Sequence, residues 1–271
     1  MKIKQVYIWI FSVVFTLAFA YYQRTTGPTY PVRGEKIIAG QTVKYKLIRS
    51  HVSEKDADIR VKELPEGFTG EVSYKRLGTN DDWTVVPMVR EGQDLNAMLP
   101  HQPPAGKLMY HVTLSSGNER VLLNDEPTVI RFKGDVPAWV LIPHIIFIFT
   151  AMLMSTRTGL EAVRKGKKTL RYAWITLITL FVAGLILGPA VQKYAFDAFW
   201  TGWPFGQDLT DNKTLVAFIF WAIAVWRLKK NPENRTWPIV AMVVLIVVFL
   251  IPHSMFGSSL DYSSGQIETG R

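Results

Sequence analysis

The stretch from Ala138 to Met154 decides the fold: it reads AWVLIPHIIFIFTAMLM and contains no charged residue. A helix needs about 20 predominantly apolar residues to cross the hydrocarbon core of a membrane, so this stretch with its flanks predicts a transmembrane helix. Other apolar segments are found at Val6–Tyr22, Tyr172–Leu187, Leu215–Trp226 and Pro238–Ile251. The sequence therefore predicts an integral membrane protein with five membrane-crossing segments.

Basic residues gather in three places beside these segments. Lys2 and Lys4 precede the first segment. The other two basic regions contain one acidic residue each, Glu161 and Glu233. The other cations lie between the second and third segments and between the fourth and fifth: Arg157, Arg164, Lys165, Lys167, Lys168, Arg171, Arg227, Lys229, Lys230 and Arg235. Short basic loops stay in the cytoplasm. We therefore expect a bacterial-type inner (plasma) membrane protein with a cytoplasmic N-terminus and a periplasmic or extracellular C-terminus.

This placement explains the formal net charge of +9 without nucleic-acid binding. The basic inner loops either set the topology alone or also bind the head groups of anionic membrane lipids. Nucleic acid is therefore not an expected partner.

The N-terminal segment, residues 1–22, has two interpretations. Met1-Lys-Ile-Lys followed by an apolar run that ends in Ala18-Phe19-Ala20 also fits a secretory signal with a small-residue cleavage site. The apolar run is long for a cleaved signal, which favours a retained transmembrane anchor or uncleaved signal. Both interpretations export the domain that follows.

That domain, residues 23–136, alternates short β-type runs with turn signals, as at Thr42–Ile48 and Gly70–Arg76. About seven such runs in some hundred residues are typical of an antiparallel β-sandwich. The run from Leu99 to Leu114 resembles the penultimate strand region of immunoglobulin-like and fibronectin-like domains. The domain's histidines, His51, His101 and His111, are not spaced as metal ligands usually are. We therefore expect the domain to contact a partner.

The predicted fold class is a multi-domain membrane protein with mixed helices and sheets. It comprises an N-terminal transmembrane anchor (1–22), an extracytoplasmic antiparallel β-sandwich (23–136), and a C-terminal four-helix transmembrane bundle (137–252) with an outer loop at 188–213. An extracytoplasmic tail (253–271) follows the bundle.

The chain has no cysteine, which excludes disulfides, thiol catalysis, thiolate metal ligands and covalent haem attachment through this chain. Hydrolase, phosphate-loop and dinucleotide signatures are also missing from the sequence. We therefore name no catalytic residue and favour a protein that is not an enzyme. The acidic run at 208–212 predicts a turn and a helix start capped by Thr210 or Asp211.

The tetrapeptide Leu-Ile-Pro-His occurs twice, ending at His144 and at His253. The predicted topology places both histidines toward the outer side of the membrane, and an ionisable residue there is a functional-site hypothesis by default. The two could share a metal, haem or quinone site. Alternatively, His253 is solvated at the interface and His144 hydrogen-bonds a neighbouring helix.

The predicted outer loop is rich in aromatic residues and also carries Gly202, Pro204 and Gly206, which fix backbone shape. Trp and Tyr favour the membrane interface, which accounts for some of the rings. A shaped loop with aromatic faces also suits a flat ligand. The aromatic residues are Tyr194, Phe196, Phe199, Trp200, Trp203 and Phe205.

With Trp200, Trp203 and Asp208, this loop resembles the tryptophan-rich loop of the haem-handling cytochrome c assembly membrane proteins. It departs from that family in the Trp-to-Asp spacing. The resemblance implies cofactor-binding roles for these three residues, with His144 and His253 as the flanking haem ligands.

Two functions follow as expectations. The first is an integral membrane accessory or interaction subunit that presents the β-sandwich and the Trp-rich loop to a partner at the outer face. That partner would be another subunit of a membrane complex or an extracytoplasmic protein. The alternative is a haem-binding or haem-handling membrane protein, serving electron transfer or cytochrome assembly, with His144 and His253 as ligands.

Overall fold

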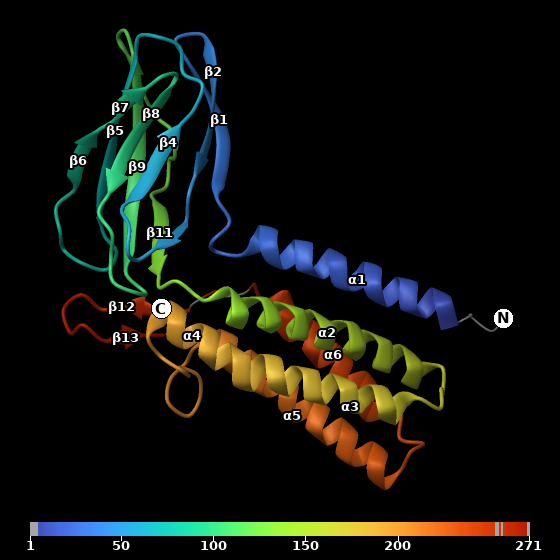
Figure 1. Cartoon of the computed structure of the whole chain (residues 1–271). Coiled ribbons are helices and arrows are strands. Elements are labelled where there is room, and N and C mark those ends of the chain that lie inside the picture. The colour runs from blue at the N-terminus through green and yellow to red at the C-terminus, as the bar shows by residue number, and fades with distance from the viewer. Residues whose placement is uncertain (1–4, 253–254, 256, 270–271) are drawn as a thin grey trace. The chain divides into compact units, whose positions relative to one another are not determined.

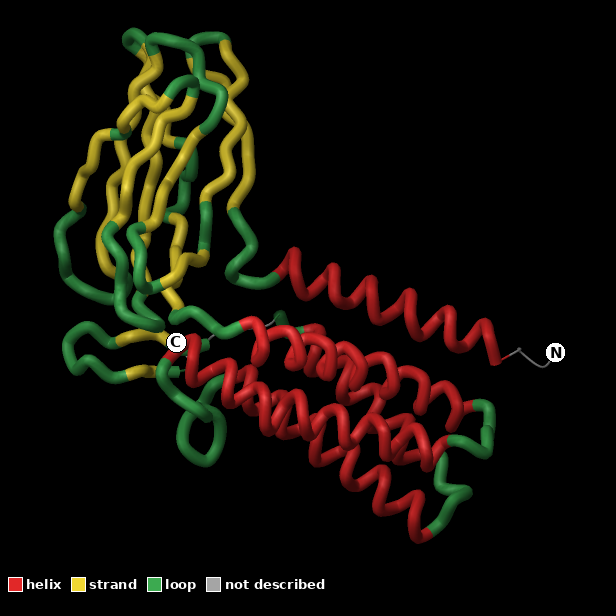
Figure 2. Tube along the Cα trace, viewed as in Figure 1, coloured by secondary structure: helices red, strands yellow, loops and turns green. Residues whose placement is uncertain are grey.

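The computed structural model describes residues 5–252, 255 and 257–269, and it divides into two compact units. The helical unit comprises the described residues of the ranges 1–28, 136–257 and 269–271. The β unit comprises residues 29–135 and 258–268. Figure 1 shows the elements in chain order, and Figure 2 shows that helices and strands are segregated between the two units.

Four helices of the helical unit are long and apolar enough to cross a membrane, which confirms the prediction of a membrane protein. They are α1 (Gln5–Thr26), α2 (Ala138–Val163), the continuous helix Thr169–Phe196, and α5 (Leu209–Lys230). The last helix, α6 (Thr236–Leu250), is apolar but only 15 residues long. The five predicted segments thus correspond to five helices.

The helix from residue 169 to 196 consists of α3 (Thr169–Leu180), the π-helix η1 (Phe181–Leu187) and α4 (Gly188–Phe196). The sequence predicted a loop over 188–213, but the segment is helical at both ends. Gly188-Pro189 resembled a helix stop because proline lacks an N–H and its ring clashes with the preceding turn of an α-helix. Here the preceding turn is a wider π turn, closed by Gly188 N–H to the Ala183 carbonyl, and the helix continues past the proline.

Small residues let the helices pack closely. A Cβ at Gly159 of α2 would lie 2.1 Å from the sulfur of Met242 on α6. A Cβ at Gly184 would lie 2.3 Å from the Thr214 methyl group on α5. Such contacts are typical of membrane helices, where packing rather than the hydrophobic effect drives association. The core of this unit also buries Trp221 completely.

In the β unit, alternation of buried and exposed side chains defines the strands. The longest strand, β9 (Lys107–Ser116), turns Leu108, Tyr110, Val112 and Leu114 into the core, as the two-residue period of a strand requires. It pairs with β5 (Phe68–Arg76), β11 (Thr128–Lys133) and β10 (Glu119–Leu122). The predicted antiparallel sheets are therefore present.

The main sheet has the strand order β3-β11-β9-β5-β6, and its β3–β11 pair is parallel. A second sheet has the order β4-β8-β7, and β1 pairs with β2 alone. One apolar cluster draws on strands of all three sheets. The remaining strands are β1 (Val32–Ile38), β2 (Gln41–Leu47), β3 (Ser50–Val52), β4 (Ala57–Val61), β6 (Thr84–Pro87), β7 (Val89–Glu91) and β8 (Asp94–Leu99).

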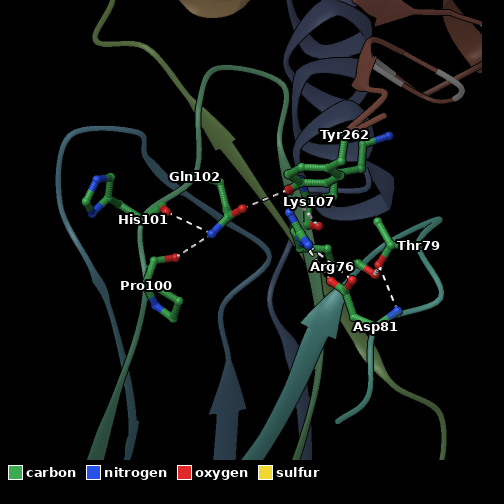
Figure 3. Close-up of polar contacts among 8 residues, drawn as sticks. All are labelled: Arg76, Thr79, Asp81, Pro100, His101, Gln102, Lys107 and Tyr262. Atoms are coloured by element: carbon green, nitrogen blue, oxygen red, sulfur yellow. Dashed lines mark hydrogen bonds and ion pairs between the residues drawn. The ribbon is translucent and has the colours of Figure 1, made fainter. Parts of the chain in front are cut away.

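The C-terminal tail adds a small hairpin to the β unit, formed by β12 (Ser259–Leu260) and β13 (Ile267–Glu268). Tyr262 holds this hairpin in place (Figure 3). Its hydroxyl accepts a hydrogen bond from the Lys107 N–H at 3.0 Å and lies 3.0 Å from Gln102 Oε1, to which it donates. The guanidinium of Arg76 lies 5.1 Å from the centre of the Tyr262 ring, and Leu260 N–H bonds to the Ala105 carbonyl at 3.0 Å.

Charge and burial shift several pKa values around this hairpin. Bonds from Ser263 and Ser264 lower the pKa of Asp261 to about 2. Burial and the nearby charge of Arg131 lower the pKa of Lys107 to about 8. Burial raises the pKa of Tyr262. The hydrogen bonds of Tyr262 and Leu260 thus attach the hairpin to the β unit. The sequence did not predict this attachment of the tail.

Candidate functional site

The candidate site is the connection between α4 and α5, residues 197–208, which we call the aromatic loop. Helix α4 ends at Asp197, whose backbone is left-handed with φ of 60°. Three aromatic side chains of the loop are mostly exposed: Phe199 at 62%, Trp203 at 69% and Phe205 at 82%. Large exposed aromatic side chains close together in sequence are characteristic of binding surfaces.

Polar side chains of the adjoining helices hold the loop in place, and those of Gln192 and Asp211 are buried. Asp211 Oδ2 accepts a hydrogen bond from the Thr201 N–H at 2.8 Å, and Asn212 Oδ1 accepts one from the Trp203 N–H at 2.7 Å. Gln192 of α4 donates to the Thr201 hydroxyl at 2.5 Å. Helices on both sides of the loop therefore hydrogen-bond the same short stretch of it, residues 201–203.

Contacts within the loop complete its shape. Trp200 Nε1 donates to the Trp203 carbonyl at 3.1 Å, and the Asp208 N–H bonds to the Thr201 carbonyl at 2.9 Å. Gly202 is required at its position, because a Cβ there would lie 2.6 Å from the Cβ of Asp211. The structure thus joins Trp200 and Trp203, two of the predicted site residues, through one hydrogen bond.

Asp208, a third predicted site residue, has a structural role. It is the N-cap of α5, and its carboxylate accepts from the N–H groups of Thr210 at 2.7 Å and Asp211 at 3.4 Å. The prediction that Thr210 or Asp211 caps this helix was wrong. Both lie inside the first turn, where their N–H groups need an acceptor, and the side chain of Asp208 immediately before the turn supplies it.

The start of α5 is tied to the end of α6 through Lys213, whose side chain is only 5% exposed. Its ammonium group donates to the Ile251 carbonyl at 2.9 Å, and it lies 5.7 Å from the centre of the Phe249 ring. The carbonyl groups at the end of a helix have no partner within the helix, so a cation is a suitable donor to them. The helix that follows the aromatic loop, α5, is therefore bonded to the end of α6.

His144 lies on α2 and hydrogen-bonds the neighbouring helix, as one of its two interpretations expected. Its Nδ1 lies 3.0 Å from the Ala183 carbonyl of η1. Because a carbonyl only accepts, Nδ1 carries the proton and Nε2 keeps its lone pair. The ring also faces Gly188, where a Cβ would lie 3.8 Å from His144 Cε1.

The shared site for His144 and His253 stays a prediction, because His253 lies outside the described residues. Within the described range, no group of three or more His, Cys, Asp or Glu side chains could hold a metal ion. The hydrogen bond that His144 makes through Nδ1 is to Ala183 of η1.

Sequence reasoning missed a buried ion pair on α2. It placed Arg157 and Glu161 in an inner loop, which was wrong, because α2 continues to Val163. Arg157 Nη1 lies 2.9 Å from Glu161 Oε2, with side chains 0% and 2% exposed. The spacing of four residues between opposite charges, with no proline between them, was the signal that the helix continues.

Residues of two other helices surround this pair. The guanidinium of Arg157 lies 5.1 Å from the centre of the Trp9 ring on α1 and 4.8 Å from that of Tyr172 on α3. Gln5 of α1 bonds both charged side chains, accepting from Arg157 and donating to Glu161 at 3.5 Å. This cluster joins three helices of the unit.

Comparison of the chain with protein-family models, with curated proteins and with solved structures found no match.

Proposed function

We propose that this protein is a non-catalytic subunit of a membrane complex that contacts a partner through the aromatic loop and the β unit. The observation that carries the proposal is the combination of exposed rings and a fixed backbone in the loop. Phe199, Trp203 and Phe205 are exposed, while Asp211 and Asn212 hold the backbone beside them. Rings presented on an ordered backbone lose little conformational freedom on binding, which favours association.

The finer architecture belongs to the same proposal. The main sheet and the β4-β8-β7 sheet would form an immunoglobulin-like sandwich around their common apolar cluster. The basic turns would lie in the cytoplasm, and the β unit and the aromatic loop outside a bacterial-type plasma membrane. The expected partner is another membrane-complex subunit or an extracytoplasmic protein.

The experiment uses the full chain, tagged and expressed in its own cell type at its natural level. Native gel electrophoresis of gently solubilised membranes should show a complex of discrete mass. Phe199→Ala/Trp203→Ala/Phe205→Ala should dissociate it. Asp211→Ala keeps all three rings and releases the backbone, so it should weaken the complex as well.

The matched control changes equally exposed rings outside the loop, Tyr21→Ala/Trp139→Ala, each 72% exposed. This control should leave the complex intact. A complex that survives the loop variants, or a wild-type chain that migrates alone, would contradict the proposal.

A second candidate function, haem binding, is favoured by one observation. Histidines that bind metals usually donate their other ring N–H to a carbonyl or carboxylate, and His144 makes this bond to Ala183. The remaining nitrogen, Nε2, is the atom that would bind iron, with His253 as the proposed second ligand. The stacking surfaces would come from Trp200 and Trp203.

The test is an absorption spectrum of detergent-purified protein from haem-replete cells, oxidised and reduced with dithionite. Haem binding predicts a Soret band and sharp reduced bands that His144→Ala or His253→Ala abolishes. His101→Ala, which changes an exposed histidine of the β unit, is the control. A colourless wild-type protein would rule out stable haem ligation.

A further inference from the structure

Two turns of the helical unit lie side by side at one end. One turn joins α2 to α3 over residues 164–168, and the other joins α5 to α6 over residues 231–235. Arg235 links them, because its Nη1 donates to the Thr169 hydroxyl at 3.0 Å and to the Gly166 carbonyl at 3.3 Å. Figure 1 shows both turns at the same end of the unit.

This end carries a dense positive charge. Eight cations on the two turns and the adjoining helix ends are exposed, and we call this set the basic end: Arg164, Lys165, Lys167, Lys168, Arg171, Arg227, Lys229 and Lys230. Within the part of the chain that the structure describes, none of the eight forms an ion pair. The nearby acids form ion pairs with other cations: Glu161 pairs with Arg157, and Glu233 pairs with Arg235.

Tryptophan rings hold several of these cations in place. Arg227 and Lys230 lie 4.9 Å and 4.3 Å from the centre of the same ring, that of Trp226. Lys229 of α5 lies 5.9 Å from the ring centre of Trp174 on α3. Stacking on a ring offsets part of the mutual repulsion of the cations but supplies no negative charge. Two cations on one ring therefore form a ready site for an anion.

We propose that the basic end binds the phosphate groups of anionic phospholipids. The turns adjoin α2, the helix 169–196 and α5, which are long and apolar enough to cross a membrane, so their cations would lie at head-group depth. Trp174 and Trp226 are 40% and 48% exposed beside them, as expected for rings at the membrane interface. Topology alone requires basic residues on these turns but does not require their stacking on tryptophans. The inference goes beyond the proposed function and does not depend on it.

The test measures the melting temperature of delipidated full-length protein in a neutral detergent. Short-chain phosphatidylglycerol, phosphatidylcholine of the same chain length, and sodium phosphate are added separately at equal concentrations. Phosphatidylglycerol should raise the melting temperature well above the effect of the other two. The variant Arg227→Gln/Lys229→Gln/Lys230→Gln should lose at least half of that difference.

Two further variants sharpen the result. Lys44→Gln/Lys46→Gln/Lys62→Gln removes the same charge from exposed positions of the β unit and should respond like the wild type. Trp226→Leu keeps every charge but removes the shared ring, and it should lose part of the shift even if the triple variant fails to fold. Equal shifts with the two lipids, a shift reproduced by sodium phosphate, or an unchanged response of both basic-end variants would overturn the proposal.

Discussion

Arg157 and Glu161 form an ion pair one helical turn apart on α2, with 2.9 Å between Nη1 and Oε2 and with both side chains buried. Charged groups inside a membrane protein are costly unless they are paired. Here each charge meets its partner, and Gln5 of α1 bonds both. The first helix is thereby tied to the interior of the helical unit.

The pair predicts non-additive mutational effects. Arg157→Met or Glu161→Met alone leaves one buried charge unpaired, and each should lower the free energy of unfolding by about 3–5 kcal/mol. The double variant removes both charges and should be more stable than either single variant. Unfolding in mixed detergent, followed by the helical circular dichroism signal, measures all three.

A second pair of the same spacing provides the control. Lys193 of α4 and Asp197, which directly follows α4, are 2.5 Å apart, with side chains 41% and 75% exposed. Because exposed pairs contribute at most about 1 kcal/mol, Lys193→Met should change stability little. Equal effects of Arg157→Met and Lys193→Met would show that burial of the α2 pair has no energetic consequence.

The first helix should remain in the mature protein. Helix α1 supplies Gln5 and Trp9 to the α2 ion pair, and Tyr22 of α1 donates to the Leu250 carbonyl of α6 at 2.9 Å. Cleavage after Ala20 would remove Gln5 and Trp9 and uncover a buried charge. Mass spectrometry of the protein purified from membranes should recover the peptides of residues 5–20. A mature chain that begins near residue 21 would contradict this prediction.

The Tyr262 hydroxyl should determine whether the C-terminal hairpin stays docked. Tyr262→Phe leaves the Lys107 N–H and Gln102 without this partner, at a cost of about 1–3 kcal/mol. Hydrogen exchange of peptides covering 258–268 should therefore become faster while the α5 peptides do not change. Tyr21→Phe, which alters an exposed tyrosine of α1, is the control. Unchanged exchange in Tyr262→Phe would mean that the hairpin is held without this hydroxyl.

Lys107 should make the β unit more stable as the pH rises from about 8. Its pKa falls from 10.5 to about 8 on folding, chiefly through burial. Between these values the unfolded chain binds more protons than the folded one, so stability increases with pH and the cost of the buried charge is largest below 8. Lys107→Met should flatten this dependence.

Urea-dependent pulse proteolysis from pH 7.5 to 9.5 measures this effect before tyrosines titrate. The burial-raised pKa of Tyr262 acts in the opposite direction only at higher pH, and it is common to both proteins. If stability changed with pH equally in the wild type and in Lys107→Met, the pH dependence would not arise from Lys107.

Much of the fold could be predicted because its signals are local. Uncharged runs such as Ala138–Met154 and alternating runs such as Lys107–Leu114 specify helix and strand by their own periodicity. The continuation of the third helix past Pro189 could not be predicted in this way. It depends on a π turn, which leaves no residue pattern of its own.

The sequence predicted which residues lie at the candidate site but not what each of them does there. Trp200, Trp203 and Asp208 do lie in one loop region, but Asp208 caps a helix, and Asp211 and Asn212 hold the loop. A carboxylate that binds a ligand and one that caps a helix have the same sequence signature. Only the direction of the neighbouring N–H groups separates them.

The docked hairpin at residues 258–268 limits the number of membrane passages that the proposed topology can contain. Residues 29–135 belong to the same unit as the hairpin, so an even number of passages must separate them. In the proposed topology, α2, the helix 169–196 and α5 would supply three, and α6 would supply the fourth although its 15 residues extend only about 22 Å. Since a hydrocarbon core is about 30 Å thick, that topology predicts a bilayer that thins around α6.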